Sequence, residues 1–142
     1  MSFAAIFTTT KQLISGDVLN KALAYILRAF ASGLTGTASG TMANSIAITE
    51  SYTEFDTVAS GAGAVLPYPT PGQSFVVYNG GLNTLTVFSA NAKNAAATGS
   101  NIINAAGSSI AGSTGISLPT VRTAQFVCMK TGLWVMFLGA AS

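Results

Sequence analysis

Two kinds of hydrophobic pattern divide the chain near residue 44. Between Asp17 and Gly33, apolar side chains recur at the i, i+3, i+4, i+7 spacing of one helical face: Leu19, Ala22, Leu23, Ile26, Leu27 and Phe30. Asp17 suits an N-cap and Gly33 suits a C-terminal stop, so the pattern predicts one α-helix. The residues from Phe3 to Phe7 predict an arm or a first strand whose apolar side chains need a neighbour.

A stretch of small residues separates this region from the rest. The segment from Leu34 to Asn44 consists mostly of Gly, Thr, Ser and Ala, so it has little to bury and predicts a linker. We therefore expect residues 1–44 to form an N-terminal arm, a helix and a linker, and residues 45–142 to form a β domain.

Strand signals begin at Ser45. The segments Ile46–Thr49 and Tyr52–Val58 carry β-branched and aromatic residues with partial alternation. The proline-rich segment Leu66–Gly72 predicts a loop or an edge, because each proline removes a ladder donor. The segments Gln73–Asn79 and Asn83–Phe88 flank a Gly-Gly pair, and this order predicts a β-hairpin.

The C-terminal third returns to strands after a less regular stretch. Residues 89–113 predict a long loop with short strands, and Gly115–Pro119 predicts another strand. Ala124–Met129 and Leu133–Leu138 flank Lys130-Thr131-Gly132 and predict a second hairpin. The expected fold is mainly β, an antiparallel β-sandwich or jelly-roll-like barrel preceded by the N-terminal arm and one α-helix.

The segment Leu133–Leu138 is apolar at every position and not at every other one. A strand of this kind is covered on both faces. We expect the chain's own core to cover one side of this strand and something else to cover the other.

Composition strengthens the expectation of a partner. Charged residues make up 7% of the 142 residues, against about 25% in an average soluble protein. Hydrophobic residues reach 49%, and the mean hydropathy is +0.52. A surface built from Thr, Ser, Asn and Gly is easily buried against copies of itself, because no charge has to be desolvated.

Several protein classes are disfavoured. A net charge of +2 from scattered Lys and Arg is too small for a nucleic-acid-binding protein. The apolar stretch Val18–Ala31 contains Lys21 and Arg28 and is too short for a bilayer, so we expect neither a membrane span nor a targeting segment, and assembly in the cytoplasm. The single cysteine, Cys128, allows no intrachain disulfide and is expected to be a buried strand thiol.

The candidate chemistry is sparse. Without histidine, Ser-His-Asp and Cys-His mechanisms are excluded, and we expect no enzyme, no cofactor and no metal. Glu50, Glu54 and Asp56 would share a strand face and offer a carboxylate hydrolase or Ca²⁺ site, but a solvated face or an interface is the favoured interpretation. All charged residues beyond Asp56 are basic. We therefore hypothesise that Glu50, Glu54 or Asp56 meets Arg122 or Lys130 of a neighbouring subunit.

An alternative function would use aromatic side chains. Trp134, Tyr68 or Tyr78 could form a stacking platform for a host glycan, as in a phage tail or head-fibre module. Aromatic residues interleaved with Val and Leu in strands are more often core or interface residues, so we rank this function second.

Residues 63–138 carry a further pattern. Val65-Leu66-Pro67, Gly72, Phe75–Gly81, Asn83–Phe88, Phe126-Val127-Cys128 and Gly132-Leu133-Trp134 together resemble small virion proteins of tailed bacteriophages. One departure is Ser89–Ala92, where the related pattern often has Pro and Gly.

The resemblance implies a capsid decoration (cement) protein or a related head or tail component, usually a homotrimer. It implies location in the virion and contact with the major capsid protein or other virion proteins. The residues expected to make oligomer or capsid contacts are Phe3, Phe7, Leu23, Phe30, Arg122, Trp134 and Phe137.

Overall fold

A computed structural model describes residues 30–38, 40–90 and 99–139 of the chain. The arm from Phe3 to Phe7 and the helical pattern up to residue 29 lie outside the described residues. From Ala31 onward, the described residues belong to one compact unit.

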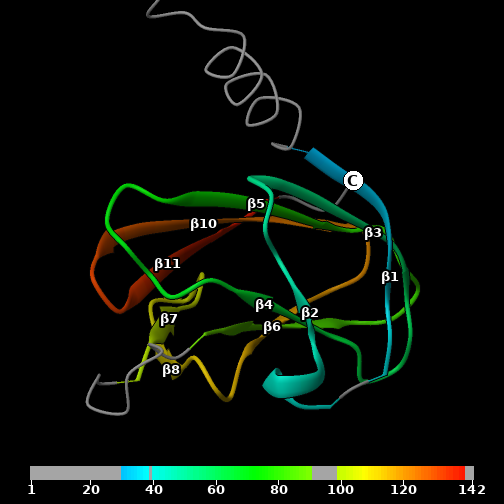
Figure 1. The fold of residues 1–142 in the computed structure, drawn as a ribbon, viewed down its shortest axis with the longest axis horizontal. Coiled ribbons are helices and arrows are strands. Elements are labelled where there is room, and N and C mark those ends of the chain that lie inside the picture. The colour runs from blue at the N-terminus through cyan, green and yellow to red at the C-terminus, as the bar shows by residue number, and fades with distance from the viewer. Residues whose placement is uncertain (1–29, 39, 91–98, 140–142) are drawn as a thin grey trace, which may run out of the picture. The chain divides into compact units, whose positions relative to one another are not determined.

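The protein is mainly β, as the strand signals predict. The described residues form a seven-stranded sheet in the order β1-β3-β5-β10-β11-β7-β8 and a four-stranded sheet in the order β2-β4-β6-β9 (Figure 1). The strands are β1 (Phe30–Gly36), β2 (Ile46–Ala47), β3 (Tyr52–Val58), β4 (Gly63–Leu66), β5 (Ser74–Asn79), β6 (Leu85–Ser89), β7 (Asn101–Ile103), β8 (Ser109–Ala111), β9 (Ile116–Leu118), β10 (Arg122–Lys130) and β11 (Leu133–Leu138), with a 3-10 helix η1 (Met42–Asn44).

Both sheets are mixed, so the expectation of an antiparallel fold is wrong. β3 pairs with β5, and β4 pairs with β6, in parallel. The cause is the path of the chain, which alternates between the two sheets from β3 to β6. After the chain has crossed to the other sheet and back, the next strand in the first sheet runs in the same direction as the previous one. The two strands therefore pair in parallel. Antiparallel pairs join β10 to β5 and to β11.

The predicted linker contains a strand. β1 is the edge strand beside β3, so residues 30–33 are not the end of a helix and residues 34–36 are not a linker. Leu34 packs against the core, and Gly36 approaches Ala62 so closely that a Cβ atom would lie 3.2 Å from the Ala62 Cβ. Tertiary pairing therefore overrides the weak local signal of these small residues.

The predicted hairpin between residues 73 and 88 is also wrong, because β5 and β6 belong to different sheets. The Gly80-Gly81 turn carries the chain from one sheet to the other. Gly81 lies against Val58, where an added Cβ would come within 2.6 Å of the backbone nitrogen. Only glycine allows the chain to pass at this distance.

Asn79 holds this crossing in place. Its side chain is fully buried, and Nδ2 donates to the carbonyl oxygens of Asn83 (2.9 Å), Leu118 (3.0 Å) and Pro119 (3.2 Å). Its Oδ1 accepts from the Gly81 N–H at 3.0 Å. One carboxamide thus joins the end of β5 to the start of the crossing and to the end of β9.

The second predicted hairpin is confirmed. β10 and β11 pair antiparallel from Ala124↔Leu138 to Lys130↔Leu133, with an irregularity between Cys128 and Lys130. β9 confirms the strand expected near residues 115–119, and β7 and β8 confirm the short strands expected within the long loop of residues 89–113.

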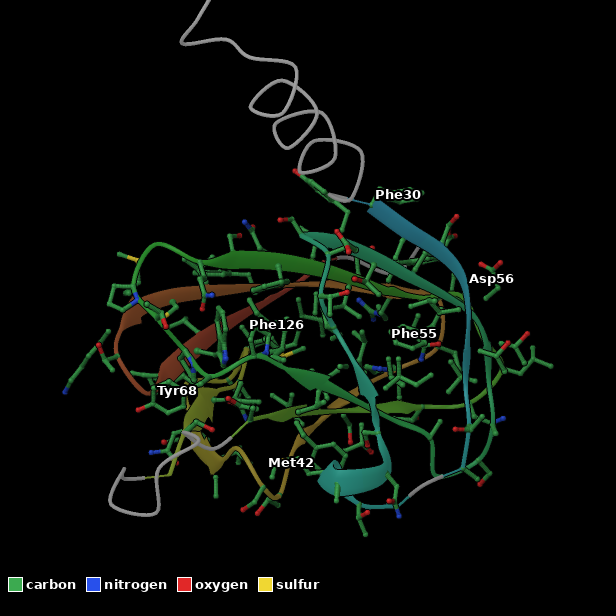
Figure 2. All side chains as sticks on the ribbon, in the orientation of Figure 1. Phe30, Met42, Phe55, Asp56, Tyr68 and Phe126 are labelled. Carbon is green, nitrogen blue, oxygen red and sulfur yellow. The ribbon has the colours of Figure 1, made fainter. Side chains whose placement is uncertain are left out.

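One hydrophobic core joins the two sheets. The seven-stranded sheet contributes Phe55, Val77, Phe126 and Trp134 among others, and the four-stranded sheet contributes Leu66, Leu85, Val87 and Leu118. Figure 2 shows Phe55 and Phe126 between the layers, with Asp56 pointing away from them. Trp134 is fully buried, and its indole N–H donates to the Pro67 carbonyl oxygen at 3.2 Å.

Replacing Asn79 should therefore destabilise the whole fold. Asn79→Ala leaves buried carbonyl oxygens and the Gly81 N–H without their partner, and we expect the free energy of unfolding to fall by about 3 kcal/mol in urea titrations. The control Leu82→Ala lies three residues away in the same turn, at a side chain that is 94% exposed. It should change the free energy by less than about 0.5 kcal/mol. Equal stability of the two variants would contradict the role assigned to Asn79.

Candidate interaction surface

The side of the seven-stranded sheet that faces away from the core is the candidate functional surface. Side chains alternate along each strand, so β3, β5, β10 and β11 each bury one set and present the other. We call the presented set the outer face. It comprises Tyr52, Glu54, Ser74, Val76, Tyr78, Thr123, Gln125, Val127, Leu133, Val135 and Phe137.

Cross-strand pairing arranges the outer face in rows. One row runs Tyr52, Val76, Gln125, Phe137, and its two terminal aromatic side chains are 54% and 57% exposed. The next row runs Ser74, Val127, Val135, Ile103. The amide nitrogen of Gln125 donates to the Ser74 hydroxyl at 3.3 Å, which joins the polar members of the two rows. Most of the remaining side chains in the rows are apolar.

β11 shows that apolar side chains occur on both faces of the seven-stranded sheet. Trp134 and Met136 are buried in the core, whereas Leu133 and Val135 are half-buried and Phe137 is exposed. Within the described residues, the chain buries Trp134 and Met136 on one face of this strand, whereas Leu138 at its end is 37% exposed and the other face is covered only in part. That the outer side of β11 is also covered, as expected from the sequence, stays a prediction.

Charged side chains lie at the border of the outer face. Glu54 and Asp56 belong to β3, and Lys130 ends β10. Among the described residues, no hydrogen bond or ion pair engages the carboxylates of Glu54 and Asp56. Arg122 differs, because its guanidinium donates to the Gly139 carbonyl oxygen at 2.9 Å.

The residues expected to make oligomer contacts fall into three groups. Phe30 and Phe137 are 59% and 57% exposed, and Arg122 is half-buried at the start of β10. Trp134 is in the core because it occupies a buried position of β11, so its ring cannot reach a partner in this conformation. Phe3, Phe7 and Leu23 lie outside the described residues.

The aromatic residues considered for glycan binding do not share a surface. Trp134 is buried against Phe75, with the ring centroids 5.6 Å apart in an edge-to-face arrangement. Tyr78 lies on the outer face, and Tyr68 lies in the loop between β4 and β5 (Figure 2). The geometry therefore offers no stacking platform built from these three side chains.

Of the three acidic residues expected to share a strand face, Glu54 and Asp56 lie on one side of β3, but Glu50 is not part of the strand. Glu54 and Asp56 follow Tyr52 at alternate positions, whereas Glu50 precedes the strand and accepts from the Thr49 hydroxyl at 3.3 Å. In the part of the chain that the structure describes, no group of three or more His, Cys, Asp or Glu side chains is placed to hold a metal ion.

Cys128 is a buried strand thiol, as predicted. It is 1% exposed, and its Sγ donates to the Lys130 carbonyl oxygen at 3.2 Å. Burial raises the pKa of the thiol above its ordinary value, although hydrogen bonds to the backbone of Lys130 and Leu133 act in the opposite direction. The thiolate is therefore disfavoured in the folded protein.

Sequence reasoning did not identify most of the outer face. The apolar rows depend on the pairing of β3, β5, β10 and β11, which are distant in the sequence. The sequence signal for an apolar outer face was weak. In Phe75-Val76-Val77-Tyr78 every residue is apolar or aromatic, including Val76 and Tyr78, which point outward.

Comparison of the chain with protein-family models, curated protein sequences and solved structures found no match. Among the described residues, no helix has the length and apolar character needed to cross a membrane.

The ionisation and reactivity of the Cys128 thiol test whether this side chain is buried in the core. Because its pKa is raised by burial, the thiol resists ionisation, and folding stability should decrease as the pH rises through the ordinary thiol pKa of 9.0.

At pH 8 we expect alkylation of Cys128 by iodoacetamide to be about 100-fold slower in the folded protein than in urea. Equal rates would show that Cys128 is accessible and would contradict its placement in the core.

Proposed function

We propose that this protein is a non-enzymatic structural component of a bacteriophage particle. In this proposal it self-associates and attaches to the capsid to stabilise or decorate it, with its two sheets assembled as a β-sandwich. Its partners are copies of itself and the major capsid protein or other virion proteins, and its location is the virion.

The observation that carries the proposal is the apolar outer face. Tyr52 and Phe137 are more than half exposed at the two ends of one row, with Val76 and Gln125 between them. Large contiguous apolar patches are rare on soluble monomers and mark sites of association. A protein partner that covers this face explains why the sheet is apolar on both sides.

The scarcity of charge supports the same proposal. The described residues carry five charged side chains: Glu50, Glu54, Asp56, Arg122 and Lys130. A surface of this kind resembles the centre of a protein interface, where charged residues are depleted and aromatic residues and Met are enriched. Burying it therefore requires little desolvation of ionised groups.

The assignment to a bacteriophage particle rests on the resemblance of residues 63–138 to small virion proteins of tailed phages. That region supplies β5, β6, β10 and β11, and three of these strands build the outer face. The resemblance and the interaction surface thus involve the same part of the chain.

A single charge on the outer face should weaken self-association. For Phe137→Lys we expect the dissociation constant measured by sedimentation to rise at least about tenfold, because a lysine replaces an exposed aromatic anchor. The control Ser117→Lys adds the same charge on β9 of the other sheet, where Ser117 is exposed, and should leave the constant unchanged. A wild-type chain that sediments as a monomer at micromolar concentration would contradict self-association.

Location in a particle has its own test. Phage particles purified on density gradients from the bacterial culture that encodes this chain should contain it, and mass spectrometry should detect many copies per particle. Recovery of the chain only in the soluble fraction, with none in the particle band, would contradict a virion role.

A further inference from the structure

The charges on the outer face lie at opposite corners. Glu54 pairs with Tyr78, and Tyr78 pairs with Thr123, so Glu54 lies at the end of the face where β10 begins. Lys130 lies at the other end of β10, seven residues beyond Thr123, or about 23 Å along the strand. β3 and β10 are separated by β5, which adds about 10 Å across the sheet.

The region between these corners is uncharged. Its central positions are Val76, Gln125, Val127 and Val135, and Tyr52 and Phe137 end the row that crosses all four strands. The outer face therefore has a mainly apolar centre, in which Gln125 is the polar member, with an acidic corner and a basic corner on one diagonal.

This arrangement is complementary to itself. A two-fold axis that lies parallel to two facing sheets, and perpendicular to the diagonal, places the acidic corner of each copy over the basic corner of the other. The apolar centres then cover each other, and like charges are kept apart. Each contact is formed twice by symmetry.

Arg122 is the weaker candidate for the ion pair. It lies at the same end of the face as Glu54, since its Cα partner on β5 is Asn79, and its guanidinium already donates to the Gly139 carbonyl oxygen. The two-fold arrangement moves it away from the partner's acids. Of the basic residues hypothesised to meet Glu54, the geometry therefore favours Lys130.

We propose that two copies of the chain pack outer face against outer face about such an axis, with Glu54 of each copy beside Lys130 of the other. This inference rests on the proposed function, because it names the surface and the partner for self-association. Its two-fold symmetry differs from the homotrimer that the resemblance implies.

A charge swap tests the pairing in the full-length chain. Glu54→Lys and Lys130→Glu should each raise the dissociation constant about tenfold, because each places two like-charged pairs in the interface. The double variant Glu54→Lys/Lys130→Glu restores both pairs and should return the constant to within about threefold of wild type. Ser117→Lys is again the control and should have no effect.

A second measurement uses cysteines at the two corners. Within one copy these positions are far beyond the reach of a disulfide. Glu54→Cys/Lys130→Cys should therefore form disulfide-linked dimers under mild oxidation, at a rate that depends on protein concentration. The single substitutions Glu54→Cys and Lys130→Cys, which keep the buried Cys128, should form few.

The outcomes separate the inference from the proposed function. Wild-type trimers, or single charge variants that associate as tightly as wild type, would overturn the two-fold pairing and leave self-association standing. A monomeric wild type would overturn both. Rescue by the double charge swap together with crosslinked dimers would support the pairing.

Discussion

The central strands of the seven-stranded sheet carry apolar side chains on both faces, and the four-stranded sheet covers only one of them. Trp134 and Met136 enter the core from β11, while Val135 and Phe137 on the same strand face outward. Burial of apolar surface is the main favourable term in folding and in association, so the face that the described residues leave uncovered favours contact with another molecule. The proposed function follows from this imbalance.

The topology determines which side chains share that face. The chain crosses between sheets at Gly80-Gly81, and the buried Asn79 side chain fixes the crossing through four hydrogen bonds. At this crossing the chain leaves the seven-stranded sheet, so β5 has β3 and β10 as its neighbours, and β6 belongs to the other sheet. The row from Tyr52 to Phe137 exists because β3, β5, β10 and β11 are neighbours in this order.

Sequence patterns predicted the local elements better than their pairing. The β10–β11 hairpin and the buried Cys128 were predictable, because a short Gly-containing turn and an apolar strand are local signals. The Asn79 crossing resembles a hairpin turn in sequence, and its long-range partners Leu118 and Pro119 are not visible there. β1 was missed because its small residues become a strand only beside β3.

The outer face was predictable in one strand only. Continuous apolar residues in Leu133–Leu138 indicated two covered faces, but the burial of Trp134 and the exposure of Phe137 depend on strand register. The acids on β3 were expected to share a face, whereas their position diagonal to Lys130 required the sheet order.

Hydroxyl-radical footprinting of the full chain across a dilution series tests the central claim most directly. The claim predicts that Tyr52 and Phe137 are protected at concentrations where the protein associates and become reactive on dilution, while Leu82, 94% exposed in the β5–β6 turn, reacts throughout. Equal reactivity of Tyr52 and Phe137 at every concentration would contradict it.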